Sequence, residues 1–395
     1  YYECYGKYFF IHVFILDFPA KELSTIMKLT FQKDDLLNGI NIVLKAVPSK
    51  TTMPILECIL IDASDNQIKL TANDMELGIE TTIEGQIIEK GIIALDAKIF
   101  LEIVRKLPDS DITIETDASF KTVITCEKAK FTIIGKSGED FSYLPAVERD
   151  DSIVISQFTL KELVRQTIFS ISDNDNNKLM TGELFDINGD EFKIVSLDGH
   201  RISIRKIQMK NSYAPKKVVV PGKTLNEVSK ILPGDADSDV TISFTEKHIV
   251  FEFDKTVVVS RLIEGEYFKI DQMLSSDYET KVKVNKKEFL SCIDRATLLV
   301  KEGDKKPIIV NITDNGMELK INSALGSMNE EIDIQKQGKD LMIGFNPKFL
   351  IDALRVIDDE EVDLYMVNPK APCFIKNIEE SYIYLILPVN FTTVA

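Results

Sequence analysis

Hydrophobic residues recur at helical spacing in three closely similar stretches of this 395-residue chain. The stretches read KIFLEIVRKLP, KTLNEVSKILP and KFLIDALRVID, and they start at Lys98, Lys223 and Lys348, which are 125 residues apart. In each stretch the apolar residues fall on one side of a helix and the Lys and Arg residues on the other, which predicts a short amphipathic helix. A period of this length indicates a domain copied in tandem, because solenoid repeats are only about 20 to 50 residues long.

Each copy also contains an earlier unit of strand and helix. The segments LTFQKDDLLNGINIVLKAV, ISQFTLKELVRQTIFSI and VKVNKKEFLSCIDRATLLV align on Asp35, Glu162 and Glu288. A hairpin is predicted after each segment, with turn residues Asp65-Asn66, Asn188-Gly189 and Asn315-Gly316. The sequence therefore predicts an α+β fold of three tandem modules, each made of two half-modules of strand, helix and strands. We place the modules at residues 27–150, 151–278 and 279–395.

Residues 1–26 do not share this pattern. The apolar run from Tyr8 to Phe18 is about half as long as a membrane span, and Asp17 interrupts it. It also lacks the basic start and the small-residue cleavage site of a signal peptide. We interpret Met27 as the natural start of the protein and the leader as an upstream extension, and we expect no membrane attachment.

The net charge and the charge distribution of the chain support opposite conclusions about nucleic acid. A formal net charge of −16 and a pI near 4.8 argue against binding to nucleic acid. Each predicted helical stretch is nevertheless positive, and together they carry +8. This distribution indicates a basic surface made of helices and an acidic surface made of sheets. The stretches are residues 36–45, 98–107, 160–168, 223–232, 286–301 and 347–356.

Catalytic and metal-binding patterns find little support. The chain has three histidines and five scattered cysteines without a C-x-x-C pair, so we expect no metal, no cofactor and no disulfide framework, and we interpret the cysteines as buried thiols. An enzyme with a general base at Asp198–His200 would lack a nucleophile and a phosphate loop. A repeat scaffold that does not bind DNA would explain the modules but not the basic helices.

One stretch differs between the copies. SLDGHRISI, from Ser196 to Ile204, replaces TANDMELGI of the first module, and only the aspartate is common to both, as Asp74 and Asp198. Gly199-His200-Arg201 is either a strand-end turn with a hydrogen-bonded histidine or a recognition feature that a single module requires.

Three tandem modules, the LDGHR motif, MPIL at Met53–Leu56 and the terminal YLILPV together resemble one family, the bacterial sliding clamps, which are the beta subunits of the replicative DNA polymerase. The resemblance covers residues 27–391. It implies a non-catalytic, cytoplasmic processivity factor of DNA replication. Two chains would join head to tail as a ring that encircles duplex DNA without sequence specificity and slides along it. The ring would tether the polymerase, the clamp loader and other proteins that carry a short clamp-binding peptide, with a Gln near one end and a Leu/Phe pair near the other.

The resemblance also implies three sets of site residues. A peptide-binding cleft, rimmed by His200 and Arg201, would contain Met180, Leu197, Gly199, His200, Arg201, Ile202, Phe268, Met273, Leu385, Leu387, Pro388 and Val389. The residues facing DNA would be Lys50, Lys98, Arg105, Asn174, Lys223 and Arg295. The dimer interface would contain Ile103, Phe131 and Ile133 of one chain and Leu298 and Leu299 of the other, with either leucine directed outward. Phe268 and Gln272 stand where the family often has Pro and Arg, so one wall of the cleft is expected to differ.

Helix geometry favours two chains in such a ring. Six helices packed about 10 Å apart give a circumference near 60 Å, and hence a bore of only about 8 Å. Twelve helices give a circumference of about 120 Å and a bore of roughly 27 Å, which admits a DNA duplex with a layer of water.

Overall fold

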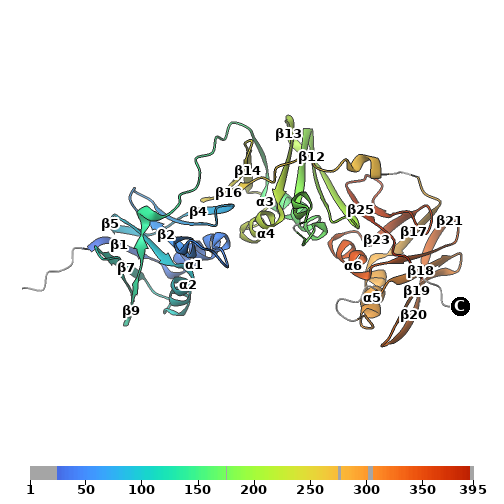
Figure 1. Cartoon of the computed structure of the whole chain (residues 1–395), viewed down its shortest axis with the longest axis horizontal. Coiled ribbons are helices and arrows are strands. Elements are labelled where there is room, and N and C mark those ends of the chain that lie inside the picture. Colours follow the sequence, from blue (N-terminus) through green and yellow to red (C-terminus); the bar gives the residue numbers. More distant parts are fainter. Residues whose placement is uncertain (1–24, 175, 275–276, 301–305, 392–395) are drawn as a thin grey trace, which may run out of the picture.

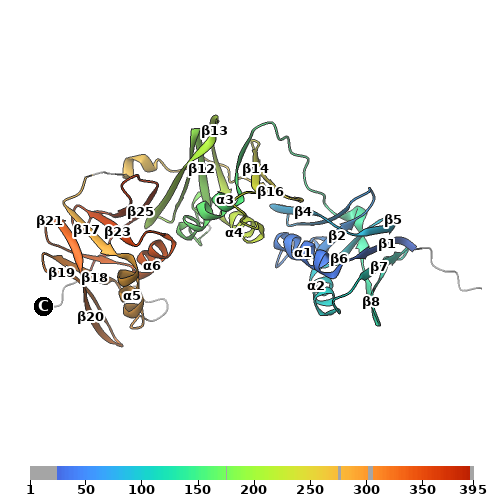
Figure 2. The same cartoon turned by 180° about the vertical axis from the view of Figure 1, so that it is seen from behind.

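The computed structural model describes residues 25–174, 176–274, 277–300 and 306–391. The predicted leader lies outside the described residues except for Thr25 and Ile26, which begin the first strand. The chain forms a crescent of three modules, with its helices along the concave side and its sheets toward the outside (Figure 1). The view from behind shows the same arrangement (Figure 2). None of the helices in the described ranges is long and apolar enough to cross a membrane.

Module one contains two helices among its strands. Its elements are β1 (Thr25–Phe31), α1 (Lys33–Val43), β2 (Cys58–Asp62), β3 (Ile68–Asn73), β4 (Leu77–Ile83), β5 (Gln86–Glu89), β6 (Ile92–Asp96), α2 (Ala97–Lys106), β7 (Ile112–Asp117), β8 (Lys121–Cys126), β9 (Ala129–Ile134) and β10 (Lys136–Ser137).

Modules two and three repeat this order of strand, helix and strands. Module two has β11 (Ser152–Ser156), α3 (Gln157–Arg165), β12 (Gly182–Leu197), β13 (Arg201–Pro221), α4 (Gly222–Ile231), β14 (Asp239–Phe244), β15 (His248–Phe253) and β16 (Thr256–Arg261). Module three has β17 (Thr280–Asn285), α5 (Lys286–Thr297), β18 (Ile308–Thr313), β19 (Gly316–Ser323), β20 (Gly326–Ile332), β21 (Ile334–Gly338), β22 (Leu341–Phe345), α6 (Pro347–Val356), β23 (Glu361–Met366), β24 (Cys373–Lys376) and β25 (Tyr382–Ile386).

All six predicted helices are present, but only α6 has the predicted ends. α2 and α4 each begin and end one residue earlier than predicted, and α3 lies three residues earlier, at Gln157–Arg165. α5 stops at Thr297, and α1 begins at Lys33 and leaves Lys45 to a 3-10 turn. With these bounds α1 gains Asp34 and Asp35 and carries a net charge of −1. The prediction of six basic helices is therefore wrong for α1, where acidic side chains in the first turn complement the helix dipole. The other five helices carry net positive charge.

A lysine of the first helix ties the two helices of each module together. The ammonium groups of Lys33, Lys161 and Lys286 donate hydrogen bonds to the backbone oxygens of Leu107, Leu232 and Ile357, at 2.6, 3.2 and 2.5 Å. These oxygens lie at the C-terminal ends of α2, α4 and α6, where the helix dipole favours a cation. One positive charge per module is thus used for packing.

Two of the sheets are shared between neighbouring modules. The nine-stranded sheet has the order β10-β6-β2-β3-β4-β16-β15-β14-β11, and the seven-stranded sheet has the order β12-β13-β25-β24-β23-β17-β21. β4 therefore pairs with β16 across the junction of modules one and two, and β13 pairs with β25 across the junction of modules two and three. The remaining sheets have five strands, ending at β9, and four strands, ending at β20.

The predicted turn at Asn188-Gly189 lies within the range of β12. The register of β12 against β13 shifts at Gly189, whose φ is +65°. The rings of Phe185 and Phe192, on either side of this point, are only 5.2 Å apart. A straight strand would separate residues seven positions apart by about 23 Å, so the chain reverses here and the prediction is confirmed.

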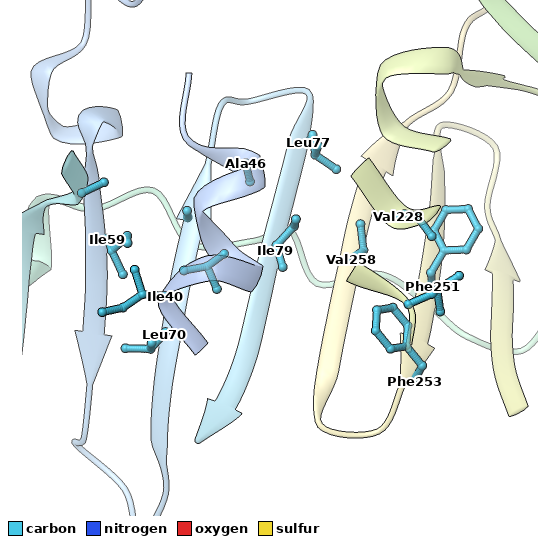
Figure 3. Close-up of a cluster of buried hydrophobic side chains, with 14 of the residues drawn as sticks. Ile40, Ala46, Ile59, Leu70, Leu77, Ile79, Val228, Phe251, Phe253 and Val258 are labelled. Carbon is cyan, nitrogen blue, oxygen red and sulfur yellow. The ribbon is translucent and has the colours of Figure 1, made fainter. Parts of the chain in front are cut away.

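A continuous apolar core joins modules one and two. It contains Ile40 of α1 and Ile79 of β4 on one side, and Val228 of α4 and Val258 of β16 on the other. Figure 3 shows these side chains on both sides of the β4–β16 pair. Each is fully buried, and burial of such a side chain stabilises a fold by about 1.5 to 3 kcal/mol. Module three has a core of its own around α5 and α6.

Candidate functional site

The structure brings together the central residues of the predicted cleft. Leu197 pairs with Ile202, and Ile202 pairs with Leu385, so the three form a row across β12, β13 and β25. All three side chains are buried in one apolar cluster, and Met180 and Phe268 pack against it. This row crosses from module two into module three.

The segment that joins modules two and three, after β16, covers much of this cluster. Tyr267 and Ile270 are buried in it, so the deepest predicted residues have little surface left for a partner. Among the predicted cleft residues, Met273 and Leu387 have the most exposed apolar side chains, at 52% and 37%. The N–H of Leu387 donates to the oxygen of His200 at 2.9 Å, which fixes the end of the terminal strand beside the DGHR turn. Pro388 is partly exposed, and the N–H of Val389 donates to the oxygen of Gly344 at 2.8 Å.

The DGHR motif is a strand-end turn built on Asp198. One carboxylate oxygen of Asp198 accepts the N–H groups of His200 and Arg201, at 2.9 and 3.1 Å. Gly199 has a φ of +86°, and a Cβ built there would meet no atom within 4 Å, so glycine is needed for conformation rather than for space. The imidazole of His200 is exposed, as the predicted rim requires, and lies 6.1 Å from the ring of Phe349.

Arg201 does not form part of the rim, because its side chain is buried. Its guanidinium binds Asp198 at 3.0 Å and Asp352 of α6 at 2.7 Å, and it donates to the backbone oxygen of Phe169. It also lies over the ring of Phe349, at 4.5 Å from the ring centre. Arg201 therefore joins module two to module three, and the sequence prediction missed its partners Phe169, Phe349 and Asp352.

The six residues predicted to face DNA are all exposed, and five of them are charged. Among the described residues, Lys50 and Lys98 form no ion pair, and Asn174 is uncharged. Arg105 is 3.0 Å from Glu102. Lys223 binds Asp74 of module one, and Arg295 binds Glu330 of β20. The helices that carry most of these residues lie on the concave side of the crescent (Figure 1).

The two ends of the crescent carry exposed apolar residues. At the module-one end, a depression of about 380 Å³ is lined by Lys98, Ile99, Glu102, Ile103, Lys106 and Phe131. Ile133 is partly exposed on β9. At the module-three end, Leu298 is 79% exposed, whereas Leu299 packs against the core of the module. Leu298 is therefore the leucine that points outward.

The described residues offer no cluster of three or more side chains that could hold a metal ion. Cys58, Cys126, Cys292 and Cys373 are free and buried, as predicted, and Cys4 lies outside the described ranges. Burial raises the pKa of Cys292 and of Cys373 to about 12.

Comparison with known proteins gives a consistent result along the chain. Models of the N-terminal, central and C-terminal domains of the DNA polymerase III beta subunit match residues 27–145, 154–269 and 271–390. The beta sliding clamp of Staphylococcus epidermidis is 34% identical over 376 residues, which are 92% of this chain and all of that protein.

Solved structures agree. A putative DNA polymerase III beta subunit from Eubacterium rectale is 77% identical, with a TM-score of 0.90 over 92% of this chain and all of that one. The DNA polymerase sliding clamp of Bacillus subtilis is 34% identical, with a TM-score of 0.89 over 93% of this chain and all of that one.

Three such domains in tandem, with helices on the concave side and shared sheets outside, define a DNA clamp. The chain belongs to the beta sliding clamp family, the beta subunits of DNA polymerase III. It is a non-catalytic processivity factor of DNA replication, and the family implies DNA and the polymerase as partners and a dimeric ring.

Proposed function

We propose that two copies of this chain close head to tail, module one against module three, into a ring around duplex DNA. The free edges of the crescent carry this proposal. The five-stranded sheet ends at β9 and the four-stranded sheet at β20. Paired edge to edge, they would form a sheet of nine strands, the size of the sheet that joins modules one and two.

The internal repeat identifies side chains that would meet in this contact. At the junction of modules two and three, His200 of a strand-end turn lies against Phe349 of α6. The positions 125 residues after His200 and 250 residues before Phe349 are Leu325 and Ile99, and both are about half exposed. Leu325 of one chain would therefore pack on Ile99 of the other. Leu298 would enter the depression formed by Ile103 and Phe131, with Ile133 beside it and Leu299 beneath.

The concave side would face the DNA and contact phosphates without reading bases. Lys50, Lys98 and Asn174 are available for such contacts, whereas Lys223 and Arg295 are held by acidic partners and would contribute less than the sequence predicts. With few free cations and an acidic exterior, the ring would hold DNA by encirclement rather than by affinity. We propose that the ring acts in the cytoplasm.

The surface around Met273 and Leu387 would dock an extended peptide from the polymerase, the clamp loader or another partner. Leu387 and Met273 supply reachable apolar surface, with His200 at the rim and Arg201 holding the junction beneath. Gly199, Pro388 and Val389 shape the backbone at the edge of this surface.

Ring closure is tested by replacing the most exposed leucine of the interface. At micromolar concentration, light scattering should give about twice the chain mass of 44.7 kDa for the unmodified protein and the mass of one chain for Leu298→Asp. The unmodified dimer should remain on circular DNA at a salt concentration that releases it from a linear fragment. The Leu298→Asp monomer should not. Ile378→Asp is the matched control, because Ile378 is 86% exposed but lies in the turn between β24 and β25, and β25 pairs with module two. A dimeric Leu298→Asp protein would contradict the proposed contact.

Docking is tested by titrating a polymerase-tail peptide against Leu387→Ala. Loss of one apolar anchor should weaken binding by about 2 kcal/mol, or roughly thirtyfold. Val154→Ala removes a side chain of similar exposure from β11 and should leave the affinity unchanged. Equal affinities for both variants would place the docking surface elsewhere.

A further inference from the structure

Equivalent backbone hydrogen bonds join the strands at the two junctions between modules. At the first junction, between modules one and two, the N–H of Arg261 donates to the oxygen of Glu76 at 2.9 Å. At the second junction, between modules two and three, the N–H of Leu387 donates to the oxygen of His200, also at 2.9 Å. The side chains differ, because Arg261 and Glu76 form an ion pair, with 3.8 Å between nitrogen and oxygen, whereas Leu387 and His200 belong to the proposed docking surface.

A second hydrogen bond lies six residues away along both strands of each junction. The N–H of Thr82 donates to the oxygen of Lys255 at 3.0 Å in the first junction, and the N–H of Lys206 donates to the oxygen of Ser381 at 2.8 Å in the second. Because the spacing is the same on all four strands, the two junctions have one antiparallel register.

The edge strand β9 of module one repeats the form of β16. β8 and β9 are joined by the turn Glu127-Lys128, and β15 and β16 by the turn Asp254-Lys255. The first residue of each turn has a positive φ, of 51° and 48°. Both edge strands then have six residues and pair with the preceding strand in the same way. Ile134 therefore stands in the place of Arg261, and Lys128 in the place of Lys255.

The edge strand β20 of module three repeats the form of the first part of β13. β20 pairs with β19 in the register in which β13 pairs with β12, and the two pairs are 125 residues apart. Leu325 therefore stands in the place of His200, and Glu331 in the place of Lys206. β9 and β20 each end a sheet, so their outer backbone groups lack a strand partner among the described residues.

We propose that the ring closes in the register of the two internal junctions, with the N–H of Ile134 bonded to the oxygen of Leu325 of the other chain. The second bond would run from the N–H of Glu331 to the oxygen of Lys128. This inference rests on the proposed ring and specifies how its edges meet. The side chains of Ile134 and Leu325 are 72% and 53% exposed in the single chain. They would form an apolar contact where the first junction has an ion pair.

Charged side chains at the two edges fit this register. Lys128 next to β9 and Asp333 after β20 are exposed, and neither has an ion-pair partner among the described residues. Their counterparts at the first junction, Lys255 and Glu84, form an ion pair. Closure would therefore give Lys128 and Asp333 a partner that each lacks in the single chain.

An exchange of side chains between junctions tests the register. Arg261 and Glu76 show that a cation and a carboxylate fit side by side at this position. Ile134→Arg alone and Leu325→Glu alone should each weaken dimerisation by about tenfold or more, because an unpaired charge then faces an apolar side chain. Ile134→Arg/Leu325→Glu should recover the dissociation constant of the unmodified protein to within about fivefold, because an exposed ion pair is close to neutral in free energy.

Sedimentation equilibrium measures the dissociation constants, and circular dichroism establishes that each variant is folded. Ile134→Arg/Leu325→Arg is the matched control, because it changes the same two positions but leaves like charges opposite each other. It should stay as weak as the single variants or weaker. Recovery in this control equal to that of the opposite-charge variant would overturn the proposed pairing.

The remaining outcomes separate the register from the ring itself. Loss of dimerisation in both single variants without recovery in Ile134→Arg/Leu325→Glu overturns the register and keeps the two edges as the interface. Single variants that dimerise like the unmodified protein, beside a monomeric Leu298→Asp, overturn the contact of Ile134 with Leu325 and keep the ring. A monomeric unmodified protein overturns both.

Discussion

The two junctions between modules have the same backbone pairing but different chemistry. At the junction of modules two and three, Arg201 is buried and contacts two carboxylates, a backbone oxygen and an aromatic ring. At the junction of modules one and two, the ion pairs are Lys223 with Asp74, Lys255 with Glu84 and Arg261 with Glu76, and the three cationic side chains are 62%, 58% and 51% exposed. The strand pairing is the same at both junctions, whereas the side chains that hold the modules together differ.

A repeated aspartate shows how this difference arises. Asp74 and Asp198 each accept backbone N–H groups of the turn that follows them. Asp74 then binds Lys223 of α4 directly, whereas Asp198 reaches Asp352 of α6 only through Arg201. Insertion of a buried cation converts a surface contact into an internal network.

The largest expected effect comes from removing that cation. Arg201→Ala leaves Asp352 and Asp198 without their partner in a buried setting, which should lower the free energy of unfolding by about 3 to 5 kcal/mol. Lys223→Ala is the matched variant at the other junction and should cost less than about 1 kcal/mol, because the lysine is mostly exposed and Asp74 keeps its hydrogen bonds from the N–H groups of Glu76 and Leu77. Urea denaturation of both variants measures the difference. Equal losses would show that the two junctions are held alike.

A smaller effect is expected at Glu183, which lies on β12 where modules one and three have Ile59 and Ile308. Glu183 is fully buried, and neither carboxyl oxygen has a hydrogen-bond partner among the described residues. Burial raises the pKa of Glu183 well above the usual range. The nearby hydroxyl of Thr167 lowers this pKa only a little, because it donates its hydrogen bond to the backbone oxygen of Leu163. Glu183→Ile should therefore raise the free energy of unfolding at pH 8 by about 1 to 3 kcal/mol.

The pH dependence gives the sign of this effect. Between pH 4.5 and the raised pKa of Glu183, the folded protein holds a proton that the unfolded chain releases. The unmodified protein should thus lose stability relative to Glu183→Ile as the pH rises through this window, and the difference should be smallest below pH 4.5. Denaturation series at several pH values measure it. A difference that grows toward acid pH would mean that the carboxyl is ionised when folded.

The smallest expected effects concern single hydrogen bonds at each junction. The hydroxyl of Tyr384 donates to the backbone oxygen of Gln166 at 3.1 Å across the second junction. Thr81 and Thr256 share a hydrogen bond of 2.8 Å across the first. Tyr384→Phe and Thr81→Val should each cost about 1 kcal/mol by urea denaturation. A much larger loss for Tyr384→Phe would show that its bond belongs to the Arg201 network.

The architecture could be predicted because the same local sequence patterns recur in each module. The period near 125 residues defined three modules, and apolar spacing defined six helices. The start of α1 could not be predicted, because Lys33, Asp34 and Asp35 are equally compatible with a loop and with a first helical turn. The direction of Leu298 depends on where α5 ends, which is likewise outside the apolar pattern.

The burial of Arg201 could not be predicted for a different reason. Its partner Asp352 is 151 residues away, and only the shared sheet brings α6 beneath the DGHR turn. Local sequence predicted which residues lie near the junctions but not which of them are buried there.

The shared sheets also have a consequence for synthesis of the chain. Thr81 of β4 is bonded to Thr256 of β16, which follows it by 175 residues. At a translation rate of about 5 to 20 residues per second, the edge of β4 waits roughly 10 to 35 s for its partner strand to leave the ribosome. An unpaired strand edge is a site of aggregation. The nascent protein is therefore most exposed to misassembly after module one is complete, and chaperones would act in that interval.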